Sequence, residues 1–181
     1  MSFAITSWDG TDDQLTQAAE LYADVFAEPP YDEERATSLA GFPSRVKRYA
    51  AEKPEFRLLL ASEGDRVVGL ALGTGIGPGD WWWDRASEEL APAARQAWLD
   101  AECFCVAELA VAASHRRRGM AEDLMDAVLR DLPYATALLG CYQDASAAQR
   151  LYTGLGWTVV DPAVQFTEER AVQVMGRRLT D

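Results

Sequence analysis

The chain has 181 residues, of which 49% are hydrophobic and 25% are charged. This is ordinary globular composition, and because no composition break divides the chain we expect one domain over residues 1–181. Acidic residues outnumber lysine and arginine by 29 to 17, which gives a net charge of −12 at pH 7. Nucleic-acid phosphates would repel such a chain, so the composition argues against a nucleic-acid partner and favours cationic ligands.

The three cysteines, Cys103, Cys105 and Cys141, each lie in an apolar run typical of a core strand. An odd number cannot all pair within the chain, and buried free thiols are typical of a reducing compartment. No stretch reaches the roughly 18 apolar residues that span a membrane. We therefore expect a cytoplasmic protein with no membrane partner, for which a homodimer is an open alternative.

Hydrophobic periodicity and turn residues predict the elements of the first half of the chain. They are a strand over 3–8, a helix after Thr11 that stops at 28–30, a helix over 32–49 interrupted near 41–43, and strands over 56–62 and 67–72. Glycines recur over 73–79, but Pro78 stands where a dinucleotide loop needs its third glycine. We therefore predict a strand-ending loop there.

The second half alternates strands with helices. Its predicted elements are a helix from Ser87 or Ala91 to Asp100, a strand over 103–111, a helix over 121–132, a strand over 135–142, a helix over 146–155, and strands over 157–160 and 171–179. The whole order predicts an α/β fold with a mixed central sheet of about six to seven strands, flanked by helices.

Residues 108–121 form the end of a buried strand, a basic turn and the start of a helix. The first amides of a helix have no internal partner and lie at its positive end, so this turn suits an anion such as a pyrophosphate. Gly119 allows a close backbone approach. Arg116, Arg117 and Arg118 add three cations that a polyanionic ligand would need, although a solvated basic patch is the alternative.

Residues 116–121, R-R-R-G-M-A, resemble the acyl-CoA signature Q/R-x-x-G-x-G/A of the GNAT superfamily of N-acyltransferases. Residues 148–157, A-Q-R-L-Y-T-G-L-G-W, resemble the later A-x-x-L/F-Y-x-x-x-G-F segment of the same family. The resemblance covers roughly residues 103 to 160 and implies the GNAT fold, with acetyl-CoA as cosubstrate. The cofactor-binding residues that it implies are Leu109, Val111, Arg116, Arg117, Arg118, Gly119, Met120 and Ala121. Leu109 and Val111 would act through their backbones, pairing with pantetheine and polarising the thioester carbonyl.

Glu108 is the only ionisable residue between Cys103 and Val111. Strand alternation places it on the same face as Phe104 and Ala110, where desolvation would raise the pKa of its carboxyl into the range of a general base. In several GNAT members an acid on this strand takes the proton of the amine through water. The alternative is a structural carboxylate that bonds to a neighbouring strand or reaches solvent.

Tyr152 resembles the general acid of the family, which protonates the departing CoA thiolate. A phenol with a pKa near 10 is matched to a thiolate near 8.5 to 9, so the transfer needs no large pKa shift. The alternative is that Tyr152 continues the apolar helix stripe of Ala148, Leu151 and Leu155.

A metal site is not predicted, because His115 is the sole histidine and Cys103-x-Cys105 lacks metal-ligand spacing. The resemblance favours an N-acetyltransferase that acts on a primary amine by direct attack in a ternary complex. The charge favours a small cationic acceptor, since acids flank the segments expected to frame its cleft. These acids are Glu28, Asp32, Glu33, Asp80, Asp84, Asp100 and Glu102. A protein N-acetyltransferase and a non-catalytic acyl-CoA sensor are the alternatives, and the tryptophans at 81–83 are either packing or acceptor-binding residues.

Overall fold

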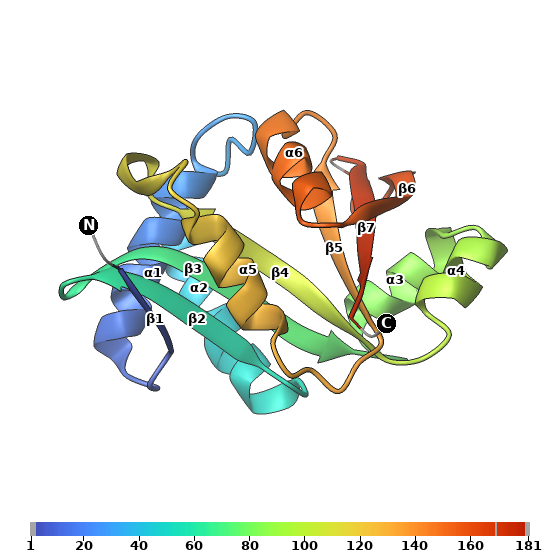
Figure 1. Cartoon of the computed structure of the whole chain (residues 1–181), viewed down its shortest axis with the longest axis horizontal. Helices are drawn as coiled ribbons and strands as arrows, with labels where there is room; N and C mark the ends of the chain where they lie inside the picture. The colour runs from blue at the N-terminus through green and yellow to red at the C-terminus, as the bar shows by residue number, and fades with distance from the viewer. Residues whose placement is uncertain (1–2, 169, 180–181) are drawn as a thin grey trace. The chain divides into compact units, whose positions relative to one another are not determined.

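The computed structural model describes residues 3–168 and 170–179 (Figure 1). Contacts between residues divide this part of the chain into two compact units. Unit 1 comprises residues 3–74 and 107–130, and unit 2 comprises 75–106 and the described residues from 131 on. The single domain expected over residues 1–181 stays a prediction, and residues 1–2, 169 and 180–181 lie outside the described part. No described helix is long and apolar enough to cross a bilayer.

Unit 1 contains a hairpin, three helices and the strand that leads into the basic turn. Its elements are β1 (Ala4–Ser7), α1 (Asp12–Phe26), α2 (Arg35–Glu52), β2 (Arg57–Glu63), most of β3 (Arg66–Ile76), the second half of β4 (Cys103–Val111), a 3₁₀ turn (Ala113–His115) and α5 (Met120–Leu129). Successive side chains of the hairpin point to opposite faces, so each face packs against a different set of helices. Leu60 and Leu70 pack with α1 and α2, whereas Gly69 faces α5 on the opposite side (Figure 1).

Helix α2 continues through Pro43, so the interruption predicted near 41–43 is wrong. An interior proline removes a helix hydrogen bond and costs about 3 kcal/mol in isolation. Burial on both sides of it compensates, because Phe42 is 1% exposed and Val46 is fully buried. The Phe42 ring stacks on Tyr22 of α1, with 4.6 Å between the centroids. Packing against α1 therefore outweighs the local preference for a break.

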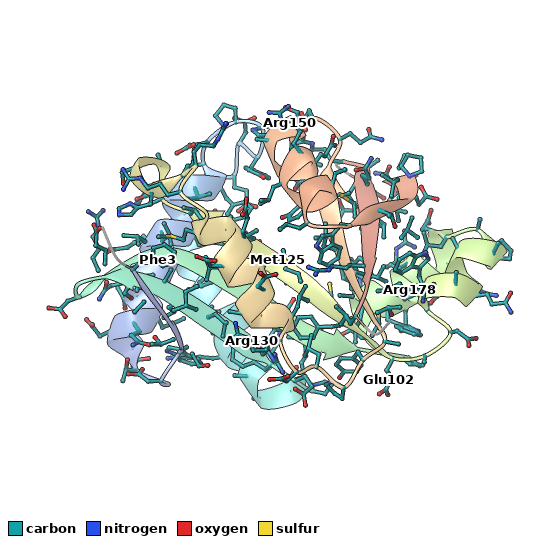
Figure 2. The ribbon with its side chains drawn as sticks, viewed as in Figure 1. Phe3, Glu102, Met125, Arg130, Arg150 and Arg178 are labelled. Carbon is teal, nitrogen blue, oxygen red and sulfur yellow. The ribbon has the colours of Figure 1, made fainter. Side chains whose placement is uncertain are left out.

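Unit 2 contains three helices and three complete strands. Its elements are the end of β3, α3 (Trp81–Glu89), α4 (Pro92–Trp98), the first half of β4, β5 (Thr136–Tyr142), α6 (Ser146–Gly154), β6 (Thr158–Val164) and β7 (Val172–Arg178). Leu138 and Val174 of the sheet share a core with Trp83 and Ala86 of α3. Arg178 donates a 2.6 Å hydrogen bond to the carbonyl of Ala97, which fixes the end of α4 on β7 (Figure 2).

Over the described residues, seven strands form one mixed sheet in the order β1-β2-β3-β4-β5-β7-β6. Strands β4 and β5 are parallel, with Phe104 opposite Ala137 and Cys105 opposite Leu138 at the beginning of both strands. The pairs β1–β2, β2–β3, β5–β7 and β6–β7 are antiparallel. This architecture confirms the predicted α/β class and the sheet of six to seven strands.

Two boundaries before β4 differ from the prediction. Strand β3 runs to Ile76, because Thr74 and Ile76 are 2% and 3% exposed and their burial outweighs the cost of the glycines between them. The helix expected from Ser87 or Ala91 is two helices, and α3 already begins at Trp81. The side chain of Asp80 caps α3 by accepting hydrogen bonds from the first amides.

Strand β6 forms one edge of the sheet and is irregular. Its register against β7 shifts between Val159 and Asp161 and again between Asp161 and Val164. Pro162 has no N–H to donate, and the N–H of Ala163 donates a 2.8 Å hydrogen bond to the Asp161 carboxylate. At Ala163 this edge therefore uses one of its own side chains to occupy a backbone donor.

Candidate active site

The basic turn lies between β4 and α5, as the sequence predicts. Strand β4 ends at Val111, and α5 begins at Met120 after Gly119, which is its N-cap with φ +81°. A Cβ built on Gly119 would meet no heavy atom within 4 Å, so the backbone of this residue is open to a ligand. Met120 is 2% exposed and faces the core, so it can serve a ligand only through its backbone.

Arg116 differs from the other two arginines of the turn in its described contacts. Arg116 is directed onto the protein: its Nη1 lies 2.7 Å from Glu28 Oε2, and its Nε donates a 3.1 Å hydrogen bond to the carbonyl of Val111. The side chains of Arg117 and Arg118 are exposed. The resemblance implies that all three arginines bind the cofactor. The contacts described for the Arg116 side chain, with Glu28 and the Val111 carbonyl, stabilise the turn.

His115 fixes the turn to the end of β2. Its Nε2 lies 3.2 Å from Glu63 Oε2, and its Nδ1 lies 2.8 Å from the hydroxyl of Ser114. The sequence predicted neither contact, and Glu63 is 52 residues away from His115 in the chain. The sole histidine therefore holds the shape of the turn.

Glu108 lies on β4 three residues before its end, and its side chain is only 12% exposed. Its Oε1 lies 2.9 Å from Nη2 of Arg45, which comes from α2. Burial raises the pKa of the Glu108 carboxyl to about 7, the positive charge of Arg45 opposes this rise, and the charge of Glu33 adds to it. The sequence predicted the raised pKa but missed Arg45.

The residues around this ion pair form a second polar contact. The Tyr22 hydroxyl lies 3.2 and 3.1 Å from the two carboxylate oxygens of Glu33, and Ser38 donates a 2.6 Å hydrogen bond to the same carboxylate. The guanidinium of Arg45 lies over the Tyr22 ring, 5.1 Å from its centroid. Arg45, Glu108, Tyr22 and Glu33 are therefore one cluster built from α1, α2, β4 and the segment between the two helices.

Tyr152 belongs to unit 2 and lies on α6, none of whose residues is buried. Its ring is partly exposed and lies 6.2 Å from the ring of Trp157, which is 2% exposed. The amide of Trp157 donates a 3.0 Å hydrogen bond to the Tyr152 carbonyl at the helix end. Ala148, Leu151 and Leu155 have the same intermediate exposure as Tyr152, so its role as general acid stays a prediction beside the alternative that it continues this helix stripe.

The tryptophans at 81–83 have three different environments. Trp83 is 7% exposed in the core, Trp82 stacks on Phe166 at 4.9 Å between centroids, and Trp81 is 59% exposed. Burial therefore separates the members of this triplet, and acceptor binding by any of them stays a prediction. Packing accounts for Trp83, and Trp81 is the one available to an outside molecule.

The acids expected near the acceptor also differ in their contacts and exposure. Glu28 and Glu33 have the partners given above, and Asp80 and Asp84 accept hydrogen bonds from backbone amides at the start of α3. The exposed acids of the predicted set are Asp32, Asp84, Asp100 and Glu102. Among the residues that the structure describes, no group of three or more His, Cys, Asp or Glu side chains could hold a metal ion.

The chain was compared with protein families and solved structures. The model described as "Acetyltransferase (GNAT) family" matches residues 15–157. Histone acetyltransferase HPA2 and related acetyltransferase from Corynebacterium glutamicum has a similar structure, with a TM-score of 0.69 and 16% identity over 100% of this chain and 98% of the other. An acetyltransferase of the GNAT family from Bacillus cereus gives 0.65 and 14% over the full length of both chains.

Naa50 from Arabidopsis thaliana, in complex with the bisubstrate analogue CoA-Ac-MVNAL, gives a TM-score of 0.59 and 18% identity over 98% of this chain and 99% of the other. A search of the curated proteins finds no match. These structural likenesses show the fold, and the family model covers more than half of the sequence. The chain therefore belongs to the GNAT acetyltransferase family.

Proposed function

We propose that the protein transfers an acetyl group from acetyl-CoA to a primary amine by direct attack in a ternary complex. Membership of the GNAT family supports the reaction class. The observation that carries the proposal is Glu108, a nearly buried carboxylate whose pKa is raised to about 7 and which lies on the strand that ends at the open turn. A group with a pKa near the working pH is the most effective proton acceptor.

The turn fits the pyrophosphate of a CoA molecule in backbone shape and in charge. Gly119 presents an open backbone before a helix of 10 residues, and the exposed side chains of Arg117 and Arg118 supply positive charge. Glu122 and Asp123 are exposed in the first turn of α5, where their charges suit the helix dipole. The residues that would hold the cosubstrate are Leu109 and Val111 through their backbones, the backbone of 116–121, and the side chains of Arg117 and Arg118.

Bound acetyl-CoA would supply an acetyl group activated as a thioester. An amine attacks only as the neutral base, so a proton must first leave its ammonium form. Oε1 of Glu108 contacts Arg45, so Oε2 is the atom that can take this proton without breaking the ion pair. Tyr152 holds a phenolic proton that can be given to the departing thiolate.

A small cationic amine is the proposed acceptor. The net charge of −12 and the exposed acids Asp32, Asp84, Asp100 and Glu102 would attract an amine that carries more than one positive charge. A protein acceptor is the alternative, because the Naa50 structure contains an analogue that joins CoA to a peptide.

A turnover screen tests these proposals. CoA release from acetyl-CoA would be measured with polyamines, aminoglycosides, amino acids and basic peptides, and with Glu108→Gln as the control. Turnover with small amines that Glu108→Gln loses is the expected result. Turnover with peptides alone would replace the acceptor proposal, and acetyl-CoA binding without any turnover would indicate an acyl-CoA sensor.

A further inference from the structure

Arg45 is held in place from several directions. Its Nη2 lies 2.9 Å from Glu108 Oε1, and its guanidinium carbon lies 5.1 Å from the Tyr22 centroid and 5.5 Å from the Phe42 centroid. Those two rings stack on each other at 4.6 Å, so they form a fixed aromatic wall. A planar guanidinium can stack on such a wall and donate to a carboxylate at the same time, which an ammonium cannot do equally well.

We propose that Arg45 is the positioning residue of Glu108: it holds Oε1 so that Oε2 is presented to the acceptor amine, and its charge favours the carboxylate form that accepts the proton. The proposal rests on the role of Glu108 as the general base. It adds a residue from α2, outside both segments that resemble the family, to the determinants of the reaction.

The charge balance of the cluster explains why a cation is needed there. Burial disfavours the carboxylate form of Glu108, and the second carboxylate, Glu33, disfavours it further. Arg45 is the cation that opposes both effects, while the Tyr22 hydroxyl and Ser38 contact Glu33. Without Arg45, Glu108 would be a buried carboxyl beside another acid, and its neutral form would persist to higher pH.

The packing of α2 also determines where the Arg45 side chain lies relative to Glu108. Val46, the next residue on α2, is fully buried, and Phe42 is buried one turn earlier. These anchors determine the rotation of α2 and therefore the direction in which Arg45 leaves the helix. Core packing therefore sets the direction of the Arg45 side chain, and with it the contact between Arg45 and Glu108.

Three variants on one helix test the proposal. Arg45→Gln removes the charge, Arg45→Lys keeps the charge but loses the planar fork, and Arg48→Gln makes the same charge change at an exposed site three residues away. In Arg45→Gln the acidic limb of the kcat/KM profile should move up by about 1–3 pH units, because an opposite charge at this distance shifts a pKa by that amount. In Arg45→Lys, which keeps the charge, the limb should stay close to its wild-type position, and Arg48→Gln should leave it unchanged.

A merely structural role predicts a different result, in which Arg45→Gln lowers activity equally at every pH. An unmoved acidic limb in Arg45→Gln would overturn the proposal. A second measurement does not need activity: ¹³C NMR of carboxyl-labelled glutamates identifies Glu108 as the signal missing from Glu108→Gln, and its titration midpoint should rise in Arg45→Gln. An unchanged midpoint there would also overturn the proposal.

The same set of variants separates this proposal from the proposed function. If Glu108→Gln keeps the wild-type rate and pH profile, Glu108 is not the base and the proposed mechanism fails. If Glu108→Gln loses the rate while Arg45→Gln keeps the wild-type limb, the proposed function stands and the role of Arg45 fails.

Discussion

Gly69 of β3 and Met120 of α5 lie so close that a Cβ on Gly69 would come within 2.8 Å of the Met120 sulfur. Met120 directly follows Gly119, the residue that opens the turn to a ligand. The absence of a side chain at residue 69 therefore sets how closely the N-terminus of α5 approaches the sheet.

Gly69→Val should destabilise the protein by about 1–3 kcal/mol, because the added side chain overpacks a core that already contains Met120 and Leu124. Urea denaturation measures this loss. Gly41→Ala is a control of opposite sign, since a Cβ on this helical glycine meets nothing within 4 Å and should add about 0.5–1 kcal/mol. Equal stability of Gly69→Val and the wild type would contradict the close packing of α5.

Gly119→Val should remove the stabilisation that acetyl-CoA gives to the protein. A ligand at about 100 times its dissociation constant adds about 2.7 kcal/mol to the free energy of unfolding, which a thermal shift detects. Gly10→Val is the matched control: Gly10 has φ +87° and open space around it, so it carries similar backbone strain without the turn. A normal acetyl-CoA shift in Gly119→Val would remove this turn from the binding site.

Tyr152→Phe should lower kcat by about 10²–10⁴-fold, the usual contribution of general acid catalysis. The KM for acetyl-CoA should change less than kcat, because the proton is needed only as the thiolate leaves. Steady-state kinetics with saturating amine provides both values. Wild-type kcat in Tyr152→Phe would return this residue to a packing role beside Trp157.

Glu108→Gln should flatten the fall of stability with rising pH. The pKa of Glu108 is raised from 4.5 to about 7, so between these values the folded chain binds more protons than the unfolded chain and the free energy of unfolding decreases as pH rises. The full effect of Glu108 is about 3 kcal/mol. Urea denaturation from pH 5 to 7.5 checks this, with the exposed Glu20→Gln as the control, and parallel curves for wild type and Glu108→Gln would contradict the raised pKa.

A polyamine acceptor should have a higher kcat/KM than a monoamine of similar length, and the difference should shrink as salt is added. Exposed acids speed the encounter with a polycation, and ions at about 0.15 M screen charges beyond about 8 Å. The experiment compares both amines at low and high ionic strength. An equal salt dependence of the two amines would exclude electrostatic selection of the acceptor.

The sequence predicted best where local pattern and burial agree. Strand β4 has the predicted bounds of 103–111, because an unbroken apolar run between charged residues leaves a buried strand few alternatives. The turn at Gly119 and the start of α5 were also predicted, to within one residue, from the glycine and the helical spacing of the apolar residues that follow it. Alternation along β4 also predicted that Glu108 shares a face with buried residues, and from this its raised pKa.

Contacts between distant segments could not be predicted in this way. Arg45 reaches Glu108 only because α2 continues through Pro43, where local rules predict a break. The contact of Arg116 with Glu28 joins residues 88 positions apart in the chain, and the predicted role of Arg116 at the cofactor stays a prediction. These contacts depend on how α1 and α2 pack, which no local pattern in the chain specifies.

The irregular edge strand β6 limits how two copies of this chain could associate. Extension of a sheet across a shared edge needs a row of backbone donors and acceptors at regular spacing. Pro162 lacks one donor, Asp161 already accepts from the N–H of Ala163, and two register shifts break the spacing. A homodimer that used the β6 edge would therefore have to be built from side-chain contacts, because this edge is protected against continuous intermolecular β-pairing and against the aggregation that such pairing starts.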